Sequence, residues 1–503
     1  MKPKTVTWTT AIVVLAALKV PVRPAAQEHE REHHRYRLVD IGTLRGPDSY
    51  FTFGVGLNNK GVAAGAAATS TPDPFNPFCI FPDCFVGHTF KWQDGVAIDL
   101  GALPGANNSG VGAMNAHGII AGVSENGLVD PVIGFPDLEP VVWKNGKLID
   151  LKTFGGNFGQ ANAINDRGQV AGFATNTISV SVSIAAFGCD VDLGVPTQSR
   201  AFIWEGGAIQ DLGTLGGTDS CAVLINQRGE VAGYSFTDTS AAPPVHPFLW
   251  HHGTMHDLGT LGGTFALVYA LNNWGDVAGS SFVTGNSVYH PAVWHRRGGI
   301  SDLGTLGGDT GNVESLNDAK QAVGVADLPG ASGSQLHHAF IWQHGVMTDL
   351  GTEDGDPCSL ALSINSGGQV VGSSTDCVNY QHAFLWEQGG RMVDLNAFVP
   401  PGSTLTLTVA TLISDRGEIA VQGILPNGDT HAVLLIPCDG ENSDESNCED
   451  GTGAARAVQN QSAHGAPLTN AGAQGNRRPN EMLDKVRARL LHRYSQGTAT
   501  SPN

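Results

Sequence analysis

A seven-residue phrase, Asp-Leu-Gly-Thr-Leu-Gly-Gly, recurs along the chain and constrains its fold more than any other feature. Intact copies begin at Asp211, Asp257 and Asp302, and looser copies begin at Asp40, Asp99, Asp150, Asp349 and Asp394. Consecutive copies are 59, 51, 61, 46, 45, 47 and 45 residues apart. A period of this length indicates a repeat protein, in which each unit buries its apolar surface against its neighbours.

Three further phrases recur in a fixed order within each interval. The first ends in a turn such as Asn165-Asp166-Arg167-Gly168, the second resembles Gly368–Ser373, and the third resembles His382–Trp386, with the sequence HAFLW. These phrases are short, rich in Val, Ile, Phe and Trp, and bounded by Gly, Asn and Asp, which is typical of strands joined by tight turns. In chain order we label the strands A, B, C and D, where D is the Asp-Leu-Gly phrase. Four strands in about 45 residues make one blade of a β-propeller.

The strands at the two ends of the repeat region predict how the blades are arranged. Strand A ends eight times, near Leu57, Met114, Ile164, Ile225, Leu271, Leu316, Ile364 and Ile413. The region opens on a lone D strand, Arg37–Ile41, and ends on a lone C strand, His431–Ile436. Pairing the two completes the last blade and leaves no open edge. The sequence therefore predicts an all-β, eight-bladed β-propeller over residues 36–437, closed by this pairing, with an open β solenoid or a seven-bladed ring as alternatives.

The repeated phrases resemble those of the HAF family, which is named for its His-Ala-Phe phrase and described as probable extracellular repeats. The matching segments are His338–Trp342, His382–Trp386 and the Asp-Leu-Gly-Thr-Leu-Gly-Gly copies, followed by Ile-Asn and Val-Val-Gly. The resemblance covers roughly residues 36–437 and implies an exported repeat protein. It brings no established reaction, so it supplies no catalytic residue.

Two residue types recur at fixed positions of strand C. Tryptophan occupies one position seven times, at Trp92, Trp143, Trp204, Trp250, Trp294, Trp342 and Trp386, and Leu435 stands there in the last unit. Histidine begins the strand at His88, His246, His290, His338, His382 and His431, with Glu139 and Arg200 in its place elsewhere. Because a ligand site rarely needs the same residue in every blade, we interpret the tryptophans as core. We expect each histidine to join strand C to an acceptor such as the Asp of strand D.

Function is expected where the chain departs from its repeat, since loops carry binding residues on a rigid scaffold. The three longest intervals hold insertions between strands B and C, at Ala66–Gly87, Glu125–Glu139 and Ala174–Ser199. The B–C and D–A connections emerge on the same face, so three adjacent insertions should form a wall there. The candidate binding residues of the wall are Phe75, Phe78, Phe81, Phe85, Asp130, Asp137, Asp190 and Asp192.

Three classes of function remain open. The first is a binding or interaction scaffold for a protein or a glycan. The second is a glycan-acting hydrolase or lyase that uses acidic residues of the wall, with Asp73 and Asp83 added to those above, although no pair stands out by spacing. The third is a structural protein of the cell envelope. An enzyme is the less favoured reading, and no catalytic residue is assigned.

Eight cysteines in a chain expected to be exported favour disulfides. Cys79 with Cys84 and Cys438 with Cys448 are local candidates. Cys358 and Cys377 lie on the same face of one blade, which leaves Cys189 for Cys221. No Cys-x-x-Cys spacing indicates a metal site.

The two ends of the chain differ from the repeats. Residues 1–26 have the positive start and apolar stretch of an export signal, and residues 27–35 are charged and rich in His. His29-Glu30-Arg31-Glu32-His33 matches a zinc-protease motif by chance, because nothing there could hold the required helix against a core. Residues 438–450 form an acidic loop flanked by cysteines, and residues 451–503 form a basic, mostly disordered tail with one short helix predicted at 480–494.

Charge limits the partners and cofactors. The net charge of −19 argues against nucleic acid, whose binding depends on cationic side chains. The longest uncharged apolar run, Ala11–Leu18, is far shorter than the ~20 residues of a membrane span. No cofactor is predicted, apart from a weak suggestion of calcium at the oxygen-rich segment Asp439–Glu445. We expect a monomer that is secreted to the periplasm or the extracellular space.

Overall fold

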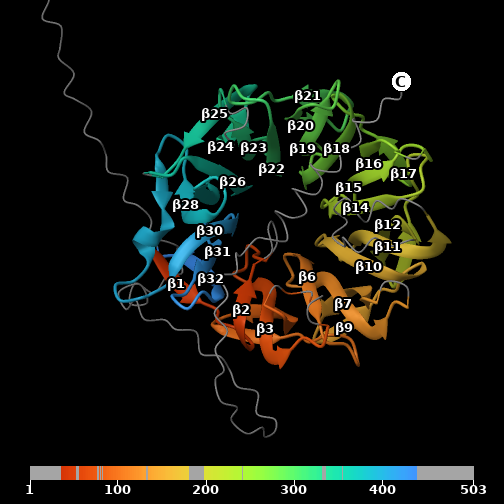
Figure 1. The fold of residues 1–503 in the computed structure, drawn as a ribbon, viewed down its shortest axis with the longest axis horizontal. Coiled ribbons are helices and arrows are strands. Elements are labelled where there is room, and N and C mark those ends of the chain that lie inside the picture. The colour runs from red at the N-terminus through yellow and green to blue at the C-terminus, as the bar shows by residue number, and fades with distance from the viewer. Residues whose placement is uncertain are drawn as a thin grey trace, which may run out of the picture.

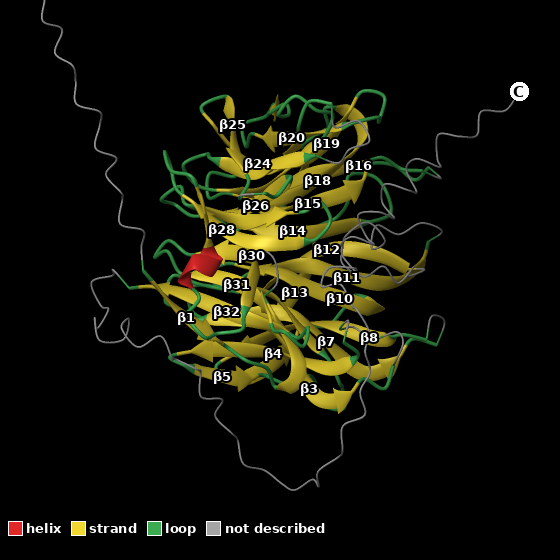
Figure 2. Ribbon diagram, turned by 60° about the vertical axis from the view of Figure 1, so that its left-hand side comes forward, coloured by secondary structure: helices red, strands yellow, loops and turns green. Residues whose placement is uncertain are grey.

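The computed structural model describes residues 35–51, 56–75, 79, 81, 83–131, 134–180, 197–240, 242–330, 336–353 and 355–438. The predicted export signal, the segment 27–34, the acidic loop after Cys438 and the basic tail with its helix lie outside these ranges. Within them the fold is all-β, as predicted, and the one helical element is the short 3-10 helix η2 (Leu395–Phe398), coloured red in Figure 2.

The described strands group into antiparallel units of four, which we number along the chain. Unit 1 is β2 (Arg45–Tyr50), β3 (Ala63–Pro72), β4 (Phe85–Gln93) and β5 (Val96–Asp99); unit 2 is β6 (Ser109–Met114), β7 (Ile120–Val129), β8 (Pro136–Lys144) and β9 (Lys147–Asp150); unit 3 is β10 (Gly155–Ile164), β11 (Val170–Ser179), β12 (Thr197–Glu205) and β13 (Ala208–Asp211); unit 4 is β14 (Ser220–Ile225), β15 (Val231–Phe236), β16 (Val245–His251) and β17 (Thr254–Asp257).

The second half of the chain repeats the pattern. Unit 5 is β18 (Gly262–Leu271), β19 (Val277–Val283), β20 (Tyr289–Trp294) and β21 (Ile300–Asp302); unit 6 is β22 (Gly311–Leu316), β23 (Ala322–Asp327), β24 (His337–Gln343) and β25 (Val346–Gly351); unit 7 is β26 (Cys358–Ile364), β27 (Val370–Thr375), β28 (Tyr380–Trp386) and β29 (Met392–Asp394); unit 8 is β30 (Thr406–Ile413), β31 (Ile419–Ile424), β32 (Thr430–Pro437) and β1 (Tyr36–Asp40). Figure 1 shows the units following one another around a central axis, with the A strands innermost.

The first and last strands of the repeat region lie side by side. β1 pairs antiparallel with β32, from Tyr36 opposite Pro437 to Asp40 opposite Val433, and the sheet order is β1-β32-β31-β30. This is the strand pairing that the lone D and C strands of the sequence predict.

Two pairs of neighbouring units are joined more closely than separate blades would be. A parallel contact of Phe158 with Leu138 links unit 3 to unit 2, and one of Phe265 with Val245 links unit 5 to unit 4. Both contacts involve the beginning of an A strand that runs ten residues, and they merge the sheets locally.

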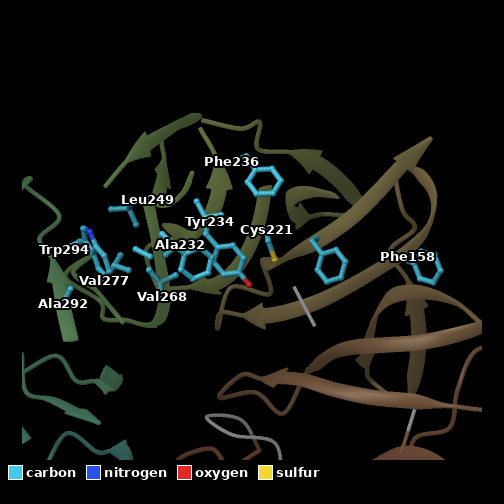
Figure 3. Packing of buried hydrophobic residues seen from close by; sticks show 14 of the residues in the cluster. Phe158, Cys221, Ala232, Tyr234, Phe236, Leu249, Val268, Val277, Ala292 and Trp294 are labelled. Atoms are coloured by element: carbon cyan, nitrogen blue, oxygen red, sulfur yellow. The ribbon is translucent and has the colours of Figure 1, made fainter. Parts of the chain in front are cut away.

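The core consists of apolar clusters between neighbouring units. The largest, drawn in Figure 3, brings Phe173 of unit 3 together with Tyr234 of unit 4 and Trp294 of unit 5. Between units 8 and 1, Leu434 and Val39 share a cluster with Phe90 and other residues. The tryptophans of strand C belong to these clusters or pack against them, which confirms that they are core residues.

The Asp-Leu-Gly phrase is a turn motif with a buried anchor. In unit 3, the Asp211 carboxylate accepts the backbone N–H of Gly213 at 2.8 Å, and Gly213 has a φ of +88° that a glycine adopts without strain. Leu212 between them is 7% exposed. The phrase therefore ends strand D, turns the chain and buries one leucine, which explains why it recurs as a block.

The repeated histidines join strand C to strand D, as expected. Nδ1 of the imidazole lies 2.9–3.0 Å from a carboxylate oxygen in the pairs His88–Asp99, His246–Asp257, His290–Asp302, His338–Asp349 and His431–Asp40. Arg200 replaces the histidine in unit 3 and contacts Asp211 at 3.0 Å. In unit 7, His382 instead contacts Asp356, at 2.8 Å.

A ladder of asparagine side chains connects the A–B turns of neighbouring units. Asn226 shows the pattern: its Oδ1 accepts the backbone N–H groups of Arg228 and Glu230, and its Nδ2 donates to the carbonyl of Asn272 in the next unit at 3.1 Å. The donors of the ladder are Asn58, Asn115, Asn165, Asn226, Asn272, Asn317 and Asn365. The sequence suggests only a turn here, because the second role of the amide requires the neighbouring unit.

The last junction of this ladder uses different residues. Ser414 stands at the asparagine position of unit 8 and caps its own turn through Oγ. Asn59 of unit 1 donates to Asp415 at 2.8 Å and accepts the backbone N–H of Asp415 at 2.9 Å. Units 8 and 1 are therefore connected by polar as well as apolar contacts.

Replacing a ladder asparagine should destabilise the protein in two separable steps. Asn226→Ala removes the turn cap and the link to Asn272, leaving buried backbone groups unpaired, and we expect a loss of about 2–4 kcal/mol. Asn226→Ser should lose about half as much, because a serine caps the same turn in unit 8. Thermal unfolding measures both, with the exposed Asn427→Ala as control; equal losses for the two Asn226 variants would contradict the ladder's role.

The pair that joins β32 to β1 should make stability depend on pH. The hydrogen bond to Asp40 raises the pKa of His431 above its usual value, with smaller contributions from Asp429 and Asp48, while burial opposes the shift. A raised histidine pKa stabilises the fold at low pH, and the contribution is lost as pH rises through the folded value. The difference in unfolding temperature between wild type and His431→Asn should therefore be larger at pH 6 than at pH 8.5. The exposed His117→Asn is the control variant; an equal loss at both pH values for His431→Asn would refute the coupling.

Candidate functional site

Three neighbouring units carry a lengthened hairpin on the face where strands B and C connect. β3, β7 and β11 are ten residues long, whereas β15, β23 and β27 are six. The insertions suggest long loops between strands B and C. Instead, part of each insertion extends strand B, and the end of that strand pairs again with strand C. We call β3–β4, β7–β8 and β11–β12 the long hairpins. Units 1 to 3 follow one another in Figure 1, coloured from red to yellow.

The ends of two long hairpins expose aliphatic side chains. Leu128 and Val129 at the end of β7 are 64% and 46% exposed, and Ile178 near the end of β11 is 55% exposed. Apolar side chains gathered on neighbouring projections often mark a surface that a partner covers. Sequence analysis missed these residues, because only the strand register shows which side chains leave the sheet.

Some phenylalanine side chains of the first long hairpin pack within unit 1. Phe81 stacks parallel to Tyr50, with ring centroids 6.5 Å apart, and it lies against Gly87, where a Cβ atom would come within 2.2 Å of the ring. Phe85 belongs to β4 and pairs with Pro72. Phe81 therefore packs within the hairpin, and Phe75 lies half-buried in the turn that follows β3. Phe78 lies outside the described residues.

Asp73, one of the candidate acids of the hydrolase hypothesis, belongs to a hydrogen-bonded network between units 1 and 2. Nδ2 of Asn108 donates to Asp73 Oδ2 at 2.9 Å and to Glu125 Oε1 at 2.7 Å. The other oxygens of these carboxylates accept backbone N–H groups, of Phe75 and Asn107. Because Asp73 and Glu125 are buried and bonded in this way, we interpret them as a structural link.

Four of the acidic side chains of unit 2, Asp130, Asp137, Glu139 and Asp150, form a group that we call the carboxylate line. Asp130 and Asp137 are each 7% exposed. Asp130 begins the turn between β7 and β8, and its Oδ2 accepts Nδ2 of Asn157 from unit 3 at 2.8 Å. Asp137 Oδ1 and Glu139 Oε2 are buried and have no hydrogen-bond partner.

Glu139 explains why this line exists in unit 2. It stands where other units have the histidine that pairs with the Asp of strand D, so Asp150 faces a carboxylate instead of an imidazole. Lys152, which takes the place of the glycine after that Asp, donates to Asp150, and Asn126 donates to Glu139 Oε1 at 3.2 Å. The substitution of one repeated residue thus creates an excess of negative charge.

Burial and mutual repulsion raise the pKa values of two carboxyl groups in the line. Burial, and then the charge of Asp130, raise the pKa of Asp137 to about 6. Burial is also the main cause that raises the pKa of Glu139, with a further contribution from Asp150. Buried carboxylates with raised pKa values are frequent at functional sites, although structural networks perturb pKa values too. Asp130 places one end of the line at the junction of units 2 and 3, through its contact with Asn157.

The disulfide predictions that the described residues can test are confirmed. Cys79 is bonded to Cys84, at the turn of the first long hairpin, and Cys358 is bonded to Cys377 in unit 7. Cys221 and Cys438 are disulfide-bonded as well. Their expected partners, Cys189 and Cys448, lie outside the described residues, as do Asp190 and Asp192.

Two further searches concern metals and membranes. Among the described residues, no group of three or more His, Cys, Asp and Glu side chains is placed to hold a metal ion. Over the same ranges, no helix combines the length and the apolar character that crossing a bilayer requires.

Comparison with known proteins gives distant structural likenesses only. No family model matches the chain, and no curated protein matches it. The β-propeller domain of the Trilobed protease from Pyrococcus furiosus is 10% identical, over 64% of this chain and 92% of that one, with a TM-score of 0.39. The GH74 enzyme of Niastella koreensis is 10% identical, over 70% of this chain and 58% of that one, with a TM-score of 0.23. At these scores neither likeness indicates what this chain does.

The unpartnered acid should make the fold more stable when its charge is removed. Because the pKa of Asp137 is raised in the folded protein, its charged form opposes folding, and stability should fall as pH rises from about 4 through 6. In metal-free buffer at pH 7.5, we expect Asp137→Asn to stabilise the protein by about 1–2 kcal/mol. Urea unfolding at pH 5 and 7.5 measures the effect, and a destabilised variant at pH 7.5 would contradict it.

Proposed function

We propose that this chain is an exported, closed, eight-bladed β-propeller of the HAF-repeat kind, and that it acts as a binding scaffold. The closed ring is supported by the pairing of β1 with β32, by the contacts between units 8 and 1, and by the His431–Asp40 pair that joins the two strands. Export is supported by the disulfides, which persist in oxidising compartments.

The observation that carries the binding proposal is the exposed aliphatic surface on the long hairpins. Leu128, Val129 and Ile178 project from neighbouring units on one face of a rigid ring. A protein partner fits this surface better than a glycan does, because sugar rings usually stack on aromatic side chains and these residues are aliphatic. The ordered strands beneath them reduce the entropy lost on binding. A purely structural role in the envelope would leave this surface without a specific partner.

A photo-crosslinking amino acid tests the surface in the exporting cell. Placed at position 128 or 178, it should give the same covalent partner, identified by mass spectrometry. Val346 is a matched control, because it is 60% exposed and aliphatic but starts β25, beside the C–D turn of unit 6. Equal products from position 346, or none from 128 and 178, would contradict a binding surface on the long hairpins.

Affinity measurements with the captured partner extend this test. Leu128→Asp and Ile178→Asp should each weaken binding at least tenfold, because a charge at the centre of an apolar contact is costly to bury. Val346→Asp should change the affinity by less than twofold. Unchanged unfolding temperatures would show that the losses arise at the surface.

A glycan-acting hydrolase is the second candidate, favoured by one observation. Asp137, with a pKa of about 6, and Asp130 form a pair of neighbouring carboxyl groups like those used as acid and base in glycoside hydrolysis. Against it, Asp137 is only 7% exposed, and its unpartnered oxygen is buried, so a glycosidic oxygen could not reach it without rearrangement. Release of sugars from a glycan panel that is lost in Asp137→Asn would establish this activity.

A further inference from the structure

Asp137 is the strongest unexplained group among the described residues. It is 7% exposed, its Oδ1 is buried, and no hydrogen-bond donor reaches that oxygen. A second buried carboxyl group, Asp130, follows Val129, which pairs with Pro136 in the same hairpin, so the two acids lie at the same end of β7 and β8. A buried anionic oxygen without a donor is unfavourable, so native proteins usually supply a partner.

The cation that lies closest to Glu139, Lys152, is engaged elsewhere. Lys152 donates to Asp150, and its side chain is 72% exposed. Asn157 contributes an amide, not a charge, and donates it to Asp130 Oδ2 at 2.8 Å. A buried oxygen admits only a proton, a water or a small ion, and a side chain of a binding partner is too large to reach it.

We propose that Asp130 and Asp137 hold a calcium ion that joins unit 2 to unit 3. Oxygen ligands without sulfur or imidazole favour a hard cation over zinc. Among the described residues no group of three or more His, Cys, Asp and Glu side chains is placed to hold a metal ion, so the two carboxylates need further oxygen ligands. The amide oxygen of Asn157, backbone carbonyls and water can supply them, since Ca²⁺ accepts six to eight ligands in flexible geometry. Low ligand charge points to a dissociation constant of about 0.1–1 mM, as in extracellular modules.

The ion would connect the second long hairpin to the first strand of unit 3. Asp130 begins the turn of the β7–β8 hairpin directly after Leu128 and Val129, and Asn157 belongs to β10 of unit 3. A cation bound between these residues would fix the second hairpin against its neighbour. The inference goes beyond the proposed binding function and does not depend on it, because ion binding is measurable without any partner.

Thermal unfolding of the full exported chain tests the site. After treatment with EDTA and dialysis, addition of CaCl₂ to 5 mM at pH 7.5 should raise the unfolding temperature of the wild type. The same addition should leave Asp137→Asn unchanged, although that variant keeps its fold by circular dichroism. Asp238→Asn is the matched control, because Asp238 is an exposed acid in the corresponding connection of unit 4, and its response should equal that of the wild type.

Calorimetric titration with CaCl₂ gives the second readout. We expect one ion per chain, with affinity at least tenfold weaker in Asp137→Asn and no heat from MgCl₂ at the same concentration. No calcium response in the wild type, an equal response in Asp137→Asn, or an equal shift with MgCl₂ would overturn the site. If the wild type shows no calcium response, the buried oxygen of Asp137 is neutralised by a proton and not by an ion. The crosslinking result from positions 128 and 178 does not depend on the outcome of this titration.

Discussion

A four-stranded unit of this chain cannot cover its own two apolar faces, and this constraint underlies the rest of the structure. Each unit buries residues such as Phe173, Tyr234 and Trp294 against the next one along the chain. In a linear stack the first and last units would each leave one such face in water. At ~25 cal/mol per Å² of apolar surface, that exposure would be costly. In the proposed ring, the apolar cluster that Leu434 and Val39 share with Phe90, together with the pairing of β1 with β32, covers these two faces where the ends of the repeat region meet.

Polar side chains make the same junctions specific. Apolar faces alone allow neighbouring sheets to slide, but the amide of Asn226 must cap its own turn and reach the carbonyl of Asn272 at once. The ladder and the His–Asp pairs therefore determine how far each unit lies from the next. Asn59 and Asp415 perform this role between units 8 and 1, with different chemistry but similar distances. The regular frame then carries the irregular part, the long hairpins of units 1 to 3, on one face.

The candidate site arises from one departure within this frame. Where five other units pair a histidine with the Asp of strand D, unit 2 has Glu139 opposite Asp150, and Asp137 and Asp130 add further negative charge nearby. The acidic side chains cost stability, because one oxygen of Asp137 and one of Glu139 are buried without donors. An ion or a proton can satisfy such an oxygen, and Leu128 of the proposed recognition surface stands two residues before Asp130.

The strands and turns of this protein can be predicted from its amino-acid sequence, because their signals are local. Strand A ends at Met114 and Ile164, where the repeated Asn follows; the strand C tryptophans are core; and Cys79 is bonded to Cys84, five residues away. Even the pairing of β1 with β32 follows from counting strands. The ladder of asparagines, the lengthening of β7 and the burial of Asp137 cannot be predicted in this way, since each depends on atoms of a neighbouring unit or strand. Turns and strands form from residues that are close in the sequence. The environment of a side chain between two units depends instead on the surfaces of both units.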